Sequence, residues 1–120
     1  MVTGVRFGTA HNGLNDWTFQ RISAVLLAIL LPVLFVILMG VYSGAITQTA
    51  VKTILGCPVT RVLHTLLMAA VLTHAYLGLK VIMEDYVHST ALRMPLVATM
   101  LVTVGGIGIG WTSIIWTWGS

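Results

Sequence analysis

One histidine in a long uncharged stretch carries the most chemical information in this chain. His74 lies in the run 72–78, and an imidazole at bilayer depth usually marks a proton relay, a ligand or a transport pathway. Asp85 and Tyr86 follow it toward the end of the same predicted helix. At about 100° per residue, Asp85 returns to within about 20° of the direction of His74, about 16 Å further along the axis. This helix therefore combines a buried imidazole with a carboxylate and a phenol at its end.

His74 has two interpretations that its residue type and depth leave open. An imidazole facing a planar macrocycle in a helix bundle is typical of an axial haem ligand, whereas a packing histidine simply bonds a neighbouring helix. Gly78, one turn on, would leave a gap beside the ring on the same face. His64 lies about 80° round the helix and cannot reach the same iron. A haem with two axial ligands therefore requires a second chain.

The other histidines have ordinary explanations. His64 follows Arg61 near the other end of the helix, where a polar interfacial residue is expected and a second haem is the alternative. His11 and His88 fall in surface segments and are expected to be solvated. For His11 the alternative is contact with an anionic group near the cytoplasmic face.

Three further residues could serve a cofactor or substrate. Arg21 either sets membrane topology or uses its guanidinium to bind carboxylates such as haem propionates. Tyr86 is either an aromatic anchor at the membrane interface or a phenol that donates a hydrogen bond to a carbonyl. Asp85, beside it, could relay protons. Each residue taken singly is explained without a ligand.

The composition is that of an integral membrane protein. Of 120 residues, 58% are apolar and 8% are charged, and the net charge of +3 sets topology here and does not indicate nucleic-acid binding. The longest polar stretch is too short for a soluble domain. The single cysteine, Cys57, excludes an intrachain disulfide, and without a Cys-x-x-Cys-His motif there is no c-type haem attachment.

Three charge-free segments predict three membrane-spanning helices. Residues 22–51, 62–79 and 94–120 lack Lys, Arg, Asp and Glu, and about 20 helical residues cross a hydrocarbon core. The prediction is an all-α membrane protein with one anchor domain, residues 1–120, that forms part of a heteromeric bundle, with helices at about 17–42, 59–85 and 91–118.

Local signals set the expected helix ends. Residues 1–15 are expected to be irregular, with Asn15 or Asp16 capping the first helix. Pro32 should kink that helix, and Pro58 should start the second after a loop over residues 43–58. The run Gly105–Gly110 predicts close helix packing.

The distribution of Lys and Arg predicts the orientation. The N-terminus and second loop carry four cationic residues, whereas the first loop and C-terminus carry two. The positive-inside rule then places the N-terminus in the cytoplasm. The start resembles neither a signal nor a transit peptide, which favours a multi-pass protein of a bacterial inner membrane.

The chain resembles the smaller hydrophobic membrane-anchor subunit of succinate dehydrogenase, respiratory complex II. The second helix carries the pattern His-Ala-aromatic-x-Gly from His74, followed by Asp85-Tyr86-Val87 at its end. The sequence Asn12-Gly13-x-x-Asp16 with Arg21, the length and the three spans are similar too.

The resemblance implies roles for particular residues. His74 matches an axial ligand to the iron of a b-type haem, Tyr86 a tyrosine that hydrogen-bonds ubiquinone, and Asp85 its acidic neighbour in proton relay. Arg21 matches an arginine near the haem propionates. His64 has no counterpart in the usual single-haem pattern.

The resemblance also implies partners and an activity. A larger cytochrome b anchor would supply the second haem ligand, while an iron–sulfur subunit and a flavoprotein would pass electrons from succinate to quinone, with membrane lipid around the anchors. This chain itself would carry no dicarboxylate active site. Two alternatives stay open: a haem-free anchor of a fumarate reductase-like complex, and a small cation or multidrug transporter. Transporters usually place a carboxylate inside a span, whereas Asp16, Glu84 and Asp85 fall at predicted helix ends.

Overall fold

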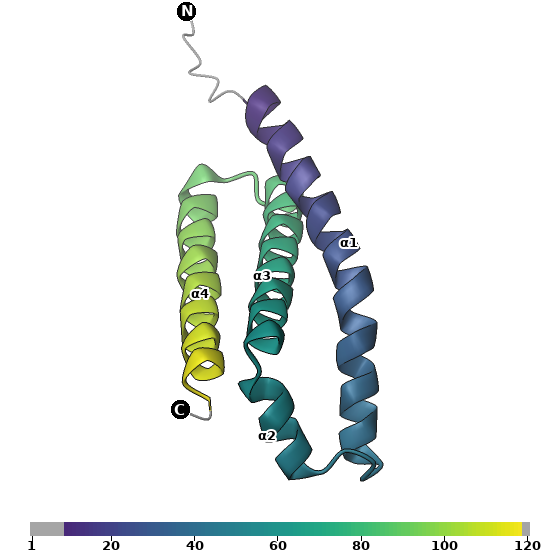
Figure 1. Cartoon of the computed structure of the whole chain (residues 1–120). Coiled ribbons are helices and arrows are strands. Elements are labelled where there is room, and N and C mark those ends of the chain that lie inside the picture. Colours follow the sequence, from purple (N-terminus) through teal and green to yellow (C-terminus); the bar gives the residue numbers. More distant parts are fainter. Residues whose placement is uncertain (1–8, 119–120) are drawn as a thin grey trace, which may run out of the picture.

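The computed structural model describes residues 9–118 of the chain, with side chains from residue 13 onward. This part is helical without strands and contains α1 (Thr9–Tyr42), α2 (Gln48–Gly56), α3 (Pro58–Tyr86) and α4 (Thr90–Thr117) (Figure 1). Three helices are long and apolar enough to cross a membrane, over Gly13–Tyr42, Pro58–Tyr86 and Thr90–Thr117. The predicted all-α fold with three spans is confirmed.

The first helix begins earlier than the sequence indicated. We expected irregular chain up to residue 15, but α1 starts at Thr9, so Asn15 and Asp16 lie within it and cap nothing. Asp16 instead accepts a hydrogen bond from Lys80 of α3. Residues 1–8, which include Arg6 of the orientation count, and the side chain of His11 lie outside the described part.

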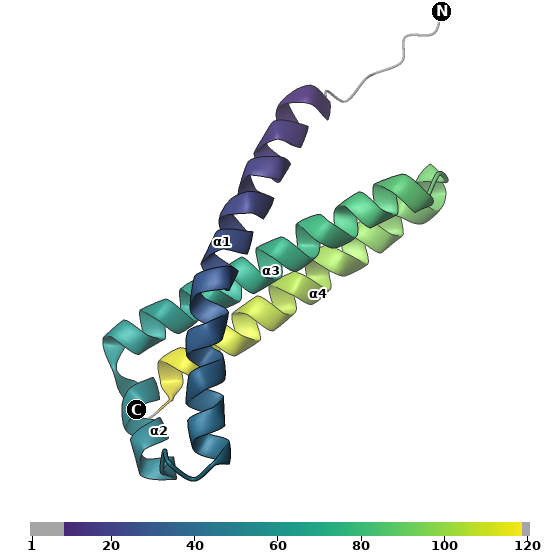
Figure 2. The same ribbon diagram turned by 90° about the vertical axis from the view of Figure 1, so that its right-hand side faces the viewer.

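Pro32 lies inside α1, where it removes one backbone hydrogen bond and its ring presses on the preceding turn. Figure 2 shows α1 changing direction along its length, in agreement with the kink predicted from Pro32. The helix ends at Tyr42, and Gly44 follows with φ +77°. That left-handed conformation suits glycine and lets the chain turn back toward the membrane.

The expected loop over residues 43–58 contains a helix, which corrects the prediction. Thr47 caps α2 by accepting a hydrogen bond from the Ala50 amide at 3.2 Å. Val51 and Ile54 are partly covered while Lys52 is exposed, so α2 is amphipathic. With nine residues, α2 is too short to be recognised from the hydropathy of the sequence. The helix packs against the start of α3 and lies across one end of the bundle (Figure 1).

The central element is α3, which packs against all three other helices. Figure 1 shows α3 between α1 and α4, and Figure 2 shows α1 crossing the α3–α4 pair. Pro58 occupies the first turn of α3, as predicted. His74 therefore lies near the middle of the helix that makes the most contacts with the others, and this packing fixes its position.

Two of the hydrogen bonds that join α3 to α4 lie near the C-terminal end of α4. The indole N–H of Trp116 donates to the hydroxyl of Thr65 at 3.0 Å, and the guanidinium of Arg61 donates to the carbonyl of Trp118. Further along, a Cβ on Gly108 would lie 3.0 Å from the Leu72 side chain. One glycine of the predicted run therefore permits close packing, whereas a Cβ on Gly105, Gly106 or Gly110 would meet nothing nearby.

Few side chains are buried within the described part of the chain. The buried hydrophobic residues are Leu67, Ala70, Leu77 and Ile115. Ser23, 3% exposed, is the one buried polar residue among those described. Large apolar side chains cover the outside of all three long helices, as expected for surfaces that meet lipid or other membrane helices.

Candidate functional site

His74 is joined to α1 through Ser23. The Nδ1 atom of His74 lies 3.2 Å from the Ser23 hydroxyl oxygen, and that hydroxyl donates to the Gln20 carbonyl at 2.9 Å. His74 is half-buried, whereas Ser23 is enclosed between the two helices. The interhelical hydrogen bond that the packing interpretation of His74 requires is therefore present in the structure, and the haem interpretation stays a prediction.

A cavity of about 330 Å³ lies beside His74. Its lining residues are Trp17, Gln20 and Arg21 of α1 and His74 of α3. The guanidinium carbon of Arg21 lies 5.3 Å from the centroid of the Trp17 ring, within the range of a cation–π contact. The structure thus brings together two candidate residues, Arg21 and His74, that are far apart in the sequence. The cavity holds a cation, an imidazole and a flat aromatic wall.

Three polar residues of α1 line up along its contact with α3, and the sequence analysis missed two of them. Asp16, Gln20 and Ser23 have the i, i+4, i+7 spacing of one helix face. Asp16 pairs with Lys80, and a Cβ added to Gly78 would lie 3.8 Å from the Gln20 amide nitrogen. The gap predicted at Gly78 is therefore next to Gln20. This shared spacing was the available signal in the sequence.

The structure does not place Asp85 and Tyr86 in the cavity beside His74. Tyr86 is the last residue of α3 and is 80% exposed; Asp85 is exposed beside it. His88 is also exposed, as predicted. The phenol and carboxylate at this helix end are accessible to a second molecule or chain.

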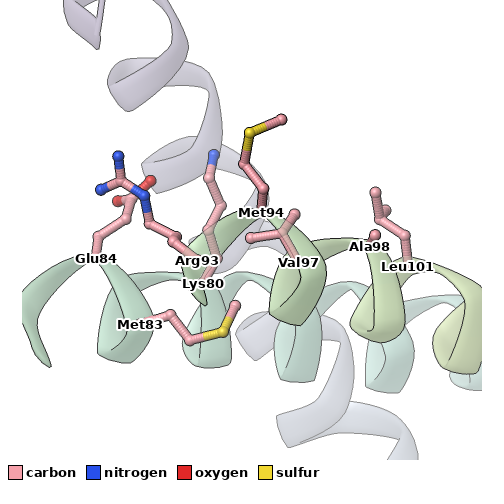
Figure 3. Close-up of a pocket in the computed structure, with 8 residues that line it drawn as sticks. All are labelled: Lys80, Met83, Glu84, Arg93, Met94, Val97, Ala98 and Leu101. Carbon is pink, nitrogen blue, oxygen red and sulfur yellow. The ribbon is translucent and has the colours of Figure 1, made fainter. Parts of the chain in front are cut away.

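A larger hollow, of about 620 Å³, lies between α3 and α4, away from the residues that line the His74 cavity. Figure 3 shows the charged side chains of Lys80, Glu84 and Arg93 toward one end and apolar side chains toward the other. Lys80 already pairs with Asp16. The positive charges of Lys80 and Arg93 are balanced by the carboxylates of Asp16 and Glu84. The charges around this hollow therefore do not favour an anionic ligand.

His64 has a hydrogen-bond partner on α4. The indole N–H of Trp111 donates to Nε2 of His64 at 3.0 Å, and the ring centroids are 6.0 Å apart. In this arrangement Nε2 is an acceptor and the ring proton belongs on Nδ1. His64 thus packs α3 against α4, which fits the interfacial interpretation of this residue.

The Asp16–Lys80 ion pair should contribute modestly to stability. The two side chains are 36% and 28% exposed, and partly exposed pairs contribute about 0.2–1 kcal/mol. We expect Asp16→Asn to lower the unfolding free energy of the detergent-solubilised protein by that amount. A double-mutant cycle with Lys80→Met, followed by circular dichroism during denaturant titration, measures the coupling. Asp85→Asn is the charge-matched control, because Asp85 is exposed at the end of α3; purely additive effects of Asp16→Asn and Lys80→Met would contradict an interaction.

The comparison with known families agrees with this arrangement. Residues 4–112 match the family model described as succinate dehydrogenase/fumarate reductase transmembrane subunit. No curated protein and no solved structure matches the chain. The match covers both sides of the His74 cavity and reaches into all three spans. The chain belongs to the family of transmembrane subunits of succinate dehydrogenase and fumarate reductase complexes.

Proposed function

We propose that this chain is the smaller membrane anchor of a succinate:quinone oxidoreductase and shares a b-type haem with a second anchor. The observation that carries the proposal is the cavity in which His74 of α3 and Arg21 of α1 meet. The family makes the chain part of a multi-subunit enzyme complex, and the proposal adds the haem, the quinone and the individual partners.

The residues around the cavity fit a haem. Within the described residues, no group of three His, Cys, Asp or Glu side chains could hold a metal ion, so a metal bound here must bring most of its own ligands. A porphyrin would do so, and His74 would then bind its iron. Arg21 supplies a charge for a propionate, and Trp17 offers an apolar surface. When bound, the haem would supply one-electron redox chemistry; this chain's residues hold and orient it.

The cavity in this chain is incomplete, which supports a partner subunit. His74 would provide one ligand from this chain, and His64 is engaged by Trp111. A larger cytochrome b anchor would supply the opposite ligand and cover the open side. These two observations support a single haem. The physiological reaction would be electron transfer from succinate, through the flavoprotein and the iron–sulfur subunit, to ubiquinone.

Tyr86 and Asp85 support a quinone site at the end of α3. Reduction of a quinone takes up two electrons and two protons, so its site needs donors close to water. Tyr86 would donate a hydrogen bond to a quinone carbonyl, and Asp85 would pass protons from the aqueous side. Their exposure leaves them free for contact with quinone and the neighbouring subunits.

Purification of the tagged chain from its native membrane tests the assembly directly. We expect three partners: a flavoprotein, an iron–sulfur protein and a second membrane anchor. The haem-free anchor alternative predicts the same type of complex without a b-type spectrum. Purification of the chain alone, together with substrate transport by the chain in liposomes, would contradict the proposal and favour a transporter.

Cys57 provides a test of the orientation. It lies exposed between α2 and α3, on the side that an N-in arrangement places outside a bacterial inner membrane. We expect a membrane-impermeant maleimide to label it from the periplasm. Ser89→Cys in a Cys57→Ser background should be protected until the membrane is opened, because Ser89 lies at the opposite end. The reverse pattern would invert the topology.

The same cysteine should react faster than an ordinary thiol. The backbone amides of Val59 and then Thr60 lower the pKa of the Cys57 thiol, because N–H groups at a helix start stabilise the thiolate. The thiolate is the reactive form, so the labelling rate should rise with pH and reach half its maximum at a lower pH than for a free cysteine. Ser43→Cys in the Cys57→Ser background is the control; identical pH profiles would contradict the effect.

A further inference from the structure

The strongest unassigned feature is the hydroxyl of Ser23. It is the one buried polar side chain among the described residues, with 3% of its surface exposed. Its oxygen lies 2.9 Å from the carbonyl oxygen of Gln20 and 3.2 Å from Nδ1 of His74. A buried hydroxyl between these two atoms must divide its donor and acceptor roles between them.

The geometry assigns those roles. A serine hydroxyl carries one proton, and the carbonyl of Gln20 can only accept it. With that proton given to Gln20 within α1, the Ser23 oxygen is free to accept the Nδ1–H of His74. In the opposite assignment the hydroxyl would donate to Nδ1, the ring proton would stay on Nε2, and His74 would lose the lone pair with which it would bind a metal.

We propose that Ser23 is a positioning residue that holds His74 in the tautomer whose Nε2 binds the haem iron. The inference rests on the proposed haem function and adds a residue that acts only through His74. Ligating histidines generally donate their second N–H to an acceptor that fixes the ring and raises its basicity. Here that acceptor belongs to a different helix, so the contact between α1 and α3 also sets the ring orientation.

The choice of a hydroxyl has a chemical consequence. A carboxylate on Nδ1–H would give the imidazole partial anionic character, whereas a serine oxygen that also donates to Gln20 is a neutral acceptor. Removal of this acceptor should lower the basicity of His74. Ferric iron benefits most from a basic ligand, so its loss should raise the reduction potential of the haem.

The experiment compares Ser23 variants in the purified complex. Ser23→Ala should weaken haem retention by about ten- to a hundredfold, measured as transfer to an added haem-scavenging protein. It should also raise the haem midpoint potential and shift the electron paramagnetic resonance of the ferric haem. Ser23→Thr keeps the hydroxyl and should restore all three values. Ser113→Ala is the matched control, because the Ser113 hydroxyl bonds the Ile109 carbonyl of its own helix.

The outcomes separate this inference from the haem assignment. If His74→Ala removes the haem while Ser23→Ala leaves retention, potential and resonance unchanged, the positioning role is overturned and the haem assignment stands. If the His74→Ala complex retains the haem, the haem assignment of His74 and the positioning role of Ser23 are both wrong. Should Ser23→Ala fail to assemble, Ser23→Cys keeps the side chain's size with a poorer acceptor; wild-type values in that variant would overturn the role as well.

Discussion

The His74→Ala complex should assemble with all its subunits and lose its b-type haem. Removing the imidazole removes the proposed ligand of the haem iron, and His64, the other histidine of α3, is engaged by Trp111. We expect the reduced-minus-oxidised b-type signal and the haem content per complex to fall close to zero. The measurement is a difference spectrum with quantified haem extraction on complexes matched for flavin content.

His64→Ala is the matched control, since it removes a histidine from the same helix. It should keep the haem and weaken only the contact between α3 and α4. Loss of haem in both variants would indicate a general packing defect. An unchanged b-type signal in assembled His74→Ala complex would remove His74 from the haem site and favour the haem-free anchor.

Tyr86→Phe should separate quinone reduction from succinate oxidation. The phenol would donate a hydrogen bond to a quinone oxygen that gains negative charge, and such bonds contribute about 1.5–3 kcal/mol. We expect succinate–quinone activity to fall by about ten- to a hundredfold. Succinate oxidation with an artificial acceptor should stay largely intact. Both activities are measured on the same purified complex.

Tyr42→Phe is the matched control for this prediction. Tyr42 ends α1 as Tyr86 ends α3, and their exposures are 88% and 80%. The two lie at opposite ends of the bundle, because α1 and α3 run antiparallel (Figure 1). Tyr42→Phe should leave quinone reduction unchanged. Equal loss of both activities in Tyr86→Phe would point to assembly in place of quinone binding.

The three membrane-spanning helices were predictable because the hydropathy of each segment is a sum over its own residues. Charge-free segments of sufficient length indicate membrane helices whatever their partners, and Pro58 marks a helix start through its own ring. The helix α2 was not predictable in the same way. It is short, and its apolar side chains are covered only through its packing against α3. The contact between Asp16 and Lys80 was likewise not predictable, because the two residues are distant in sequence.

The candidate site was predictable in part. The depth of His74 suggested a functional imidazole, and the family pattern added Arg21, Tyr86 and Asp85 as proposed partners. Hydropathy did not reveal Ser23, because a single serine in a membrane helix most often bonds its own backbone. Ser23 does so too, and its second contact exists only where α1 crosses α3.

The separation between Ser23 and His74 also affects how the protein is made. These residues are 51 positions apart, so the cavity does not exist when α1 first enters the bilayer. Until α3 follows, Asp16 lacks its contact with Lys80 and Ser23 lacks its contact with His74, so this polar edge of α1 is without its partners on α3. A ligand that needs both helices could therefore be taken up only after α3 is in place, and a nascent chain arrested before α3 would still expose that polar edge of α1.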